Sequence, residues 1–334
     1  MRPFTYDRSA QAGAAQADPA TNMPGRAAWI AGGTTMLDLM KLDVLRPSAL
    51  VDLNDNGDAS LRAVDVGADG LRLGALVSMA QAASDARILR DYPVIAQSLS
   101  LAASAQLRNM ATLGGNALQR TRCEYFRNTA IGTCNKREPG SGCAALDGFN
   151  RAHAILGASD TCIATYPGDF AQALIALDAS VEVSNKGAKR TMPFADLHRL
   201  PGNTPHIENN LQPGDVITAY VVPTAPDTRR SVYLKIRDRQ SYQFALASAA
   251  VAIDIDGGTV RNARIALGGV ATVPWRAREA EQFLNGKTLD ENTASEAARR
   301  AFVSATPRKH NAFKVALGQQ TLTRALLAAQ AMEI

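Results

Sequence analysis

The chain has 334 residues, of which 46% are hydrophobic and 20% charged, with a formal net charge of +5 and a pI near 9.1. This composition excludes a disordered chain, and the length predicts at least two hydrophobic cores. The positive charge does not predict nucleic-acid binding, because Lys and Arg are mixed with Asp and Glu along the chain and aromatic residues make up only 5%.

The sequence contains no stretch of 18 uninterrupted apolar residues, so we expect no membrane span. The first residues also lack the apolar core of an export signal and a twin arginine. We therefore expect a cytoplasmic protein, or a periplasmic one that is exported together with a signal-bearing partner.

Short apolar strands and helices alternate in the first 225 residues. Residues 27–31 predict a strand, which leads through Gly32-Gly33 into a helix over 36–42. Thr35 and Asp38 are spaced like a capping box at the start of that helix. Further strands are expected at 50–53, 70–76, 152–156 and 181–183, and further helices after Ser78, at 93–107 and at 170–177; the stretch 108–116 has neither period.

The character of the sequence changes after Pro223-Thr224-Ala225-Pro226. Antiparallel strands are predicted at 231–236, 245–255 and 263–267, with a hairpin turn at 256–258 and helices at about 275–285, 292–304 and 311–330. We therefore expect a first domain over 1–225, with subdomains at about 1–60 and 61–225, and a second domain over 226–334.

Two glycine pairs, Gly32-Gly33 and Gly114-Gly115, lie at predicted turns. Backbone amides at such turns bind pyrophosphate well, because glycine allows close approach. Neither pair is followed by the Lys-Ser/Thr of a P-loop. An ordinary turn remains the alternative reading, and phosphate binding is favoured by the polar neighbours Thr34, Thr35, Thr112 and Asn116.

All four cysteines fall in one irregular insert over 119–165, which predicts a shared role for Cys123, Cys134, Cys143 and Cys162. An iron–sulfur cluster tolerates such irregular spacing. Structural zinc usually brings Cys-x2-4-Cys knuckles, which are missing here, and nothing signals the secretion that disulfides would suit. Spacing alone leaves all three alternatives open. The charge of a thiolate-ligated cluster would be offset by the basic residues of the insert, Arg120, Arg122, Lys136 and Arg137.

The four histidines are far apart in the sequence and form no metal-binding motif, so we expect structural roles for them. No hydrolase motif occurs either, and we expect no catalytic residue in the chain.

Several segments resemble the flavin subunit of the molybdenum hydroxylases, the family of xanthine dehydrogenase and aldehyde oxidase. They are Ile30-Ala31-Gly32-Gly33-Thr34-Thr35, Arg108-Asn109-x-Ala-Thr-Leu-Gly114-Gly115-Asn116, Pro167-Gly168-Asp169, Leu211-x-Pro-Gly-Asp215-Val-Ile217 and Gly268-Gly269-Val270-Ala271-x-x-Pro274-Trp275-Arg276. The resemblance implies an α+β fold: an FAD-binding domain of the vanillyl-alcohol-oxidase (PCMH) type with two α/β subdomains, and a C-terminal α+β domain of the CO-dehydrogenase-flavoprotein type.

The same resemblance implies which residues bind FAD. The pyrophosphate would be wrapped by Ala28, Trp29, Ile30, Ala31, Gly32, Gly33, Thr34, Thr35 and Met36. The other side of the diphosphate and the ribityl chain would be lined by Thr112, Gly115 and Asn116. Asp169 would accept from ribityl or ribose hydroxyls, and Ile217 would pack near the adenine or the ring edge. Lys235 would lie near the isoalloxazine, where a cation stabilises reduced flavin.

The insert departs from the ordinary family pattern. Arg120-Thr-Arg-Cys123, Cys134-Asn-Lys-Arg137 and Pro139-Gly-Ser-Gly-Cys143 resemble the subgroup of bacterial aldehyde oxidoreductases whose flavin subunit carries an additional [4Fe-4S] cluster. This resemblance implies that all four cysteines are its ligands.

By resemblance, the chain is the electron-transfer flavin subunit of an enzyme that oxidises aldehydes to carboxylic acids. A large partner subunit would hold molybdenum cofactor, and a small partner with [2Fe-2S] clusters would pass electrons to the FAD. The FAD would deliver them to an external acceptor. The alternative is a stand-alone FAD-dependent oxidoreductase of the same fold, which would need an acid or base over the flavin ring.

Overall fold

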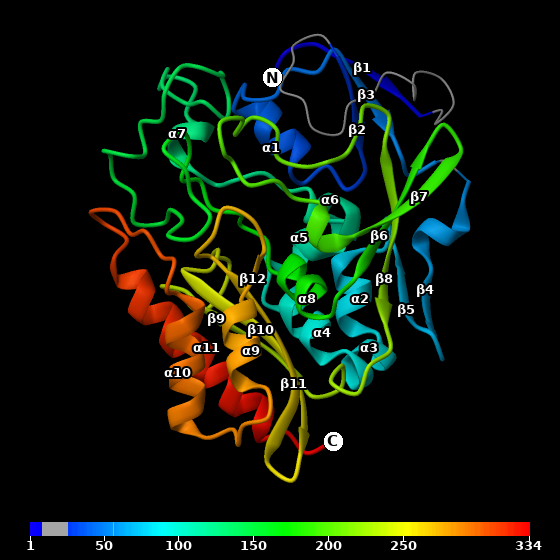
Figure 1. Cartoon of the computed structure of the whole chain (residues 1–334). Coiled ribbons are helices and arrows are strands. Elements are labelled where there is room, and N and C mark those ends of the chain that lie inside the picture. Colours follow the sequence, from blue (N-terminus) through cyan, green and yellow to red (C-terminus); the bar gives the residue numbers. More distant parts are fainter. Residues whose placement is uncertain (9–25, 56) are drawn as a thin grey trace.

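The computed structural model describes residues 1–8, 26–55 and 57–334, which form an α+β protein with three separate sheets (Figure 1). Two sheets precede residue 225 and one follows it. The three-stranded sheet lies at the top of Figure 1, the five-stranded sheet at the right, and the C-terminal helices at the lower left. No helix of the described residues has the length and apolar character needed to cross a membrane.

The first sheet is parallel, in the order β1–β3–β2. Its elements are β1 (Thr5–Asp7), β2 (Ala27–Ile30), β3 (Ala49–Asp52) and the connecting helix α1 (Met36–Lys41). Leu39 and Leu50 are buried in its core, and Phe126 and Cys134 of the insert pack into the same core. The insert, hereafter the cysteine segment (residues 119–165), is therefore anchored on the first sheet.

The second sheet is antiparallel, in the order β4–β5–β8–β6–β7. Its strands are β4 (Val64–Gly67), β5 (Gly70–Gly74), β6 (Ser180–Asn185), β7 (Ala188–Pro193) and β8 (Val216–Pro223). The helical elements of this region are η1 (Ala59–Arg62), α2 (Met79–Ser84), α3 (Ala86–Asp91), α4 (Pro93–Ser100), α5 (Ala105–Met110), α6 (Leu113–Ala117), α8 (Phe170–Ala176) and η2 (Phe194–Asp196).

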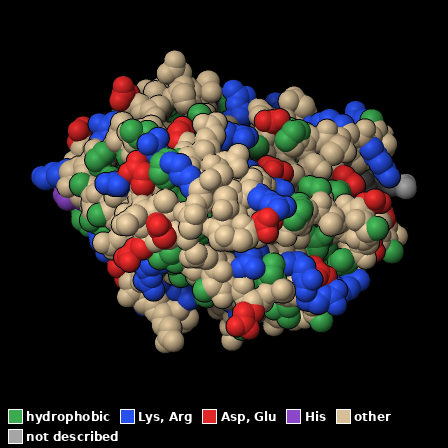
Figure 2. Space-filling model, turned by 60° about the horizontal axis from the view of Figure 1, so that its bottom comes forward, with side chains coloured by type: hydrophobic (Ala, Val, Ile, Leu, Met, Phe, Trp, Pro, Cys, Tyr) green, Lys and Arg blue, Asp and Glu red, His purple; other side chains and the backbone are tan. Residues whose placement is uncertain are grey.

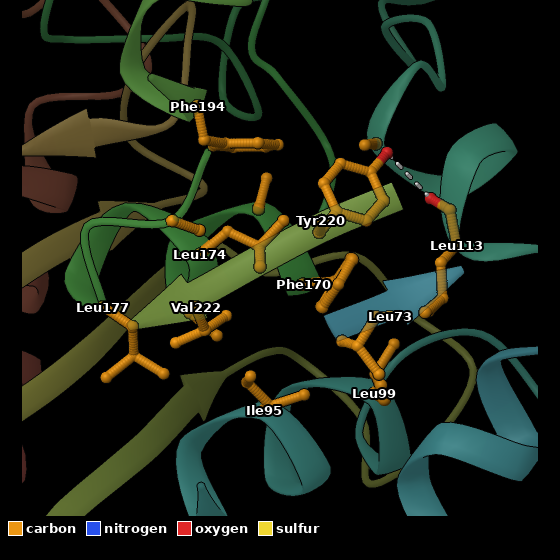
Figure 3. Close-up of a cluster of buried hydrophobic side chains, with 14 of the residues drawn as sticks. Leu73, Ile95, Leu99, Leu113, Phe170, Leu174, Leu177, Phe194, Tyr220 and Val222 are labelled. Carbon is orange, nitrogen blue, oxygen red and sulfur yellow. Dashed lines mark hydrogen bonds between the residues drawn. The ribbon is translucent and has the colours of Figure 1, made fainter. Parts of the chain in front are cut away.

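Aliphatic side chains and the rings of Phe170, Phe194 and Tyr220 fill the core between this sheet and its helices (Figure 3). Tyr220 of β8 packs edge-on against Phe170 and Phe194, with ring centroids 5.6 and 5.8 Å apart. Its hydroxyl donates to the carbonyl of Leu113 at 3.4 Å, which satisfies the one polar atom of a fully buried ring. This bond ties the start of α6 to the sheet.

The third sheet is antiparallel, in the order β12–β11–β10–β9, and helices pack against it. The elements are β9 (Ser231–Ile236), β10 (Ala247–Asp256), β11 (Thr259–Gly268), β12 (Trp275–Arg276), α9 (Arg278–Leu284), α10 (Glu291–Ala301) and α11 (Phe313–Gln330). Asp290 and Thr293 form a capping box that fixes the start of α10.

Positively and negatively charged side chains are interspersed over the face shown in Figure 2.

The cysteine segment contains little regular structure besides α7 (Glu124–Arg127). It is held instead by side-chain bonds, among them the ion pairs of Arg122 and Arg127 with Asp38.

The structure confirms the predicted strand–glycine–helix unit at 27–42, the cap at Ser78 and the hairpin at 256–258, but corrects four details. The expected helix 93–107 is two helices, because Ala103 adopts a left-handed conformation (φ 48°) and Ser104 caps a new helix. The stretch 108–116, without visible period, contains the end of α5 and most of α6, which was too short to show a period. Residues 152–156 form only one bridge, between Leu156 and Ala271.

The predicted capping box at α1 is also wrong. Thr35 occupies the N-cap position without a side-chain bond, because its backbone is already helical (φ −100°, ψ −45°). Asp38 points instead to the cysteine segment, where it accepts from Arg122 at 2.9 Å and from Arg127 at 2.7 and 3.0 Å. The carboxylate therefore joins α1 to the segment that carries the four cysteines.

Candidate cofactor site

A cleft lies where the first sheet faces the second. Its walls are the loop from β2 to α1, the start of α6, residues 75–76, residues 208–209 and the start of β8.

The loop from β2 to α1 depends on both of its glycines. Gly33 has φ 71°, a conformation that L side chains rarely adopt. A Cβ at Gly32 would lie 2.0 Å from the carbonyl oxygen of Met110, which belongs to the second glycine loop. Gly32 therefore allows the two loops to touch, and this close approach forms one end of the cleft.

The second loop is held by its own hydrogen bonds. Thr112 is the N-cap of α6, and its hydroxyl oxygen accepts from the amide of Gly115 at 3.3 Å, which leaves the hydroxyl proton available to a ligand. The amide of Gly114 donates to the carbonyl of Ala75 at 2.9 Å. Gly115 also has little room for a side chain, since a Cβ there would lie 3.2 Å from the Thr112 hydroxyl.

Two buried polar atoms near the loops have no hydrogen-bond partner among the described residues, namely Trp29 Nε1 and Asn116 Oδ1. Such unpartnered atoms are costly unless a ligand or water satisfies them. A donor and an acceptor beside two glycine turns fit a polar, phosphate-bearing ligand such as FAD.

Most of the expected FAD-binding residues line this cleft. They are Ala28, Trp29, Ile30, Ala31, Gly32, Gly33, Thr34, Thr35, Met36, Thr112, Gly115 and Ile217. Three others lie outside its lining: Asn116, Asp169 and Lys235. Asn116 follows Gly115 directly in α6, and its amide nitrogen lies 3.3 Å from the sulfur of Met79.

Asp169 and Lys235 form a buried ion pair, with Nζ 2.7 Å from the carboxylate. Asp169 also accepts from the Tyr233 hydroxyl at 2.6 Å, and Lys235 donates to the carbonyl of Leu101 at 3.1 Å. Burial raises the pKa of Asp169, although Lys235 acts in the opposite direction. The pair joins the second sheet region to β9 of the third.

Sequence reasoning missed the ion cluster in the wall of the cleft. Glu208 accepts from Arg120 at 2.5 Å and from Lys136 at 2.7 Å. Burial on its own would raise the pKa of Glu208, but the two cations outweigh it and lower the pKa to about 2. No motif surrounds Glu208 in the sequence, so only the fold could reveal this group.

The four cysteines line one small cavity, together with Phe126 and Ala145. Cys134 and Cys143 face each other across an antiparallel bridge, and all four are free thiols. The described residues contain no group of three Cys, His, Asp or Glu side chains placed to hold a metal ion. The loop between Cys134 and Cys143 is fixed by Asn135, whose backbone and side chain both bond to Gly142.

Burial controls the pKa of two of these thiols. It raises the pKa of Cys123 to about 12, against hydrogen bonds from backbone amides, and that of Cys162 to about 11, against the charge of Lys136 and a backbone amide. Thiols with such a pKa are protonated and unreactive at neutral pH, and a metal would have to displace their protons on binding.

The basic residues of the segment bind carboxylates or backbone carbonyls of the protein. Arg120 and Lys136 pair with Glu208, Arg122 pairs with Asp38, and Arg137 donates to the carbonyls of Tyr125 and Phe126 at 2.8 Å. Lys136 also lowers the pKa of Cys162 through its charge.

Two families match the chain. Residues 4–225 match the FAD binding domain in molybdopterin dehydrogenase, and residues 232–329 match the CO dehydrogenase flavoprotein C-terminal domain. Together they account for both of the fold types that the sequence led us to expect.

Individual proteins agree with this. The chain is 46% identical, over 99% of both chains, to the FAD-binding subunit of the aldehyde oxidoreductase of Escherichia coli (strain K12). It is 24% identical to the glyceraldehyde dehydrogenase medium chain of Sulfolobus acidocaldarius, over 83% of this chain and 80% of that one. The solved structure of Cu,Mo-CO dehydrogenase superposes with a TM-score of 0.73 at 25% identity, over 99% of each chain.

Replacing Gly32 by Ala should weaken FAD binding. The new Cβ would meet the carbonyl of Met110, and overpacking of this kind costs about 1–3 kcal/mol, or about tenfold in affinity if half of it opposes binding. Gly67→Ala is the matched control, because a Cβ there meets nothing within 4 Å. Flavin per chain, measured after release from the purified protein, should fall only in the first variant. Equal flavin content in both would show that the contact of the loops does not matter.

Glu208→Gln should destabilise the protein by roughly 3 kcal/mol, because Arg120 and Lys136 lose their shared counter-charge. The pKa of Glu208 is about 2 when folded and 4.5 normally, so its contribution is complete above pH 4.5 and is lost as the pH falls towards 2. The difference in the free energy of unfolding between wild type and variant, measured with urea at pH 6 and pH 3, should therefore be smaller at pH 3. Glu296→Gln, which breaks an exposed pair with Arg300, should change stability by less than about 1 kcal/mol. A gap that is the same at both pH values would contradict this assignment.

Proposed function

Because the chain belongs to the family of FAD-binding medium subunits of the molybdenum hydroxylases, we propose that it is the electron-transfer flavin subunit of an enzyme that oxidises aldehydes to carboxylic acids. The observation that carries this proposal is the full-length similarity to an aldehyde oxidoreductase subunit, together with a cleft that is lined by most of the residues expected to bind FAD. FAD supplies the electron-carrying chemistry when bound, and the chain supplies binding and orientation.

The residues of the cleft suit binding better than substrate chemistry. Two of its carboxylates, Glu208 and Asp215, are both bound in ion pairs, Asp215 with Arg190 at 2.5 Å. A carboxylate held in this way is poorly placed to exchange protons with a substrate. This argues against the alternative, a stand-alone flavin oxidoreductase that oxidises its own substrate.

The first loop would hold the diphosphate with the amides of Gly32 and Gly33 and the hydroxyls of Thr34 and Thr35, and the Thr112 hydroxyl would donate from the other side. Ile217 would provide an apolar contact at the edge of the cleft. Asp169 and Lys235 would act as one unit, because a ligand hydroxyl that donates to Asp169 must share it with Lys235 and Tyr233.

We also propose that Cys123, Cys134, Cys143 and Cys162 ligate a [4Fe-4S] cluster. All four line the same cavity, in a segment anchored to both the first sheet and the cleft wall. Four cysteine thiolates are the ligand set of a [4Fe-4S] cluster, which suits four cysteines that line one cavity. Its position beside the ion pairs of Glu208 would place it next to the flavin site.

The remaining components would be partner subunits. Among the described residues that line the cleft there is no free acid–base pair for aldehyde chemistry, so a large subunit with molybdenum cofactor would perform the oxidation. A small subunit with [2Fe-2S] clusters would deliver single electrons to FAD, and an external acceptor would remove them.

Changing Cys134 or Cys143 to Ser should remove about four iron and four sulfide per chain while part of the flavin remains bound. Thr161→Ser, which alters the same cavity but no thiol, is the control and should keep the cluster. Metal and acid-labile sulfide analysis of the purified proteins gives the answer. Zinc without sulfide in the wild-type protein would prove the cluster assignment wrong.

The isolated chain should not oxidise aldehydes. Dye reduction with an aromatic aldehyde should be observed only after co-expression with a molybdenum subunit and a [2Fe-2S] subunit. Electron transfer requires fixed geometry, so the three chains should elute together from a size-exclusion column as a permanent complex. Aldehyde turnover by the chain alone would favour the stand-alone flavin enzyme.

A further inference from the structure

A histidine, His153, contacts Cys123, which is one of the four proposed cluster ligands. His153 Nε2 lies 3.1 Å from the sulfur of Cys123. The histidine is only 5% exposed, and its ring packs at an angle against Tyr125, with centroids 6.0 Å apart. A buried imidazole at this distance is within hydrogen-bonding reach of the sulfur.

The other ring nitrogen indicates where the proton resides. His153 Nδ1 is buried and has no hydrogen-bond partner among the described residues. A neutral imidazole carries one proton, and a proton on Nδ1 would be a buried donor without an acceptor. On Nε2 the same proton points at Cys123, and a metal-bound thiolate is purely an acceptor. The arrangement therefore favours the Nε2–H tautomer once Cys123 is a thiolate.

The C-terminal domain holds the peptide that presents this ring. Lys314 of α11, itself fully buried, donates to the carbonyls of Ala152 and His153 at 3.1 Å and to that of Gly269 at 2.7 Å. Asn311 donates to the carbonyl of His153 and to that of Ala154, both at 3.3 Å. Both side chains are fully buried, so the position of His153 is set by the start of α11 and not by the cysteine segment alone.

We propose that His153 donates its Nε2–H to the Cys123 thiolate and so raises the reduction potential of the cluster, and that Lys314 and Asn311 are the positioning residues for this donor. The inference rests on the [4Fe-4S] cluster proposed above. Reduction adds one electron to the cluster and moves no proton in this scheme. Because the added negative charge is shared with the ligand sulfurs, a donor to one of them stabilises the reduced state more than the oxidised state.

The test compares the cluster potential of the complete protein with that of two His153 variants. His153→Phe keeps the ring shape and removes the donor, whereas His153→Gln keeps an N–H. In the Phe variant the ratio of reduced to oxidised cluster at a fixed potential should fall about tenfold, a shift of about 59 mV for a one-electron couple. His153→Gln should restore part of the shift. The potential is read from electron paramagnetic resonance during a mediated redox titration, and iron and sulfide are counted in each sample.

His310→Phe is the matched control. His310 packs at a tilt against Phe149, with ring centroids 5.2 Å apart, and its backbone N–H donates to Asn150 at 3.0 Å, but among the described residues no hydrogen bond joins its ring to a cysteine. Its variant should keep the wild-type potential. Lys314→Met tests positioning, because it removes the two bonds to the carbonyls of Ala152 and His153 without altering the ring, and it should lower the potential in the same direction. If Lys314→Met does not fold, Asn311→Ser gives the same comparison.

The outcomes separate the two proposals. A wild-type protein without iron and sulfide defeats the cluster itself. A cluster-bearing His153→Phe variant with unchanged potential overturns the role of His153. Loss of the cluster in both the Phe and Gln variants also overturns it, because His153 would then be a ligand. If only the Phe variant loses the cluster, His153→Met, which also lacks the donor, provides the potential to compare.

Discussion

The half-buried carboxylate of Glu208 is the group on which the arrangement of the two candidate cofactor sites depends. It receives Arg120, which lines the cleft beside the flavin loops, and Lys136, which lines the cysteine cavity. Two cations and one carboxylate out of water are stable only as a set, since each charge left alone costs several kcal/mol. The set therefore forces three separate stretches of chain to meet at one point, and that point lies between the cleft and the cavity.

Contacts with backbone groups also hold the loops and the cysteine segment in place. Gly32 brings the first loop against the carbonyl of Met110, and Lys314 gathers three carbonyls from the cysteine segment and the third sheet. These contacts use backbone groups that have no partner in a sheet or helix, and a buried carbonyl without a donor would be costly. The irregular segment is thus ordered by side chains of its neighbours, with little help from its own secondary structure.

The carboxylates of the site are fixed in ion pairs, so they are poorly placed for proton transfer. Asp169 is bound to Lys235, Asp215 to Arg190, and Glu208 to its two cations. An electron-transfer subunit needs fixed cofactors in a dry environment of defined charge, and it needs no acid or base near the ring. Trp29 Nε1, in the cleft lining, and Asn116 Oδ1, in α6 next to Gly115, are buried and have no hydrogen-bond partner among the described residues.

The sequence by itself determined the local units: strand–glycine–helix at 27–42, the hairpin at 256–258, and the grouping of four cysteines, because turn chemistry and period depend on neighbours in the chain. Its family motifs also identified the fold and most of the cleft lining. Only the tertiary structure decided the roles of Asp38, Glu208 and His153, whose partners lie 30 to 89 positions away. No local pattern marks such residues, since a buried charge or imidazole is specified by what the fold brings against it.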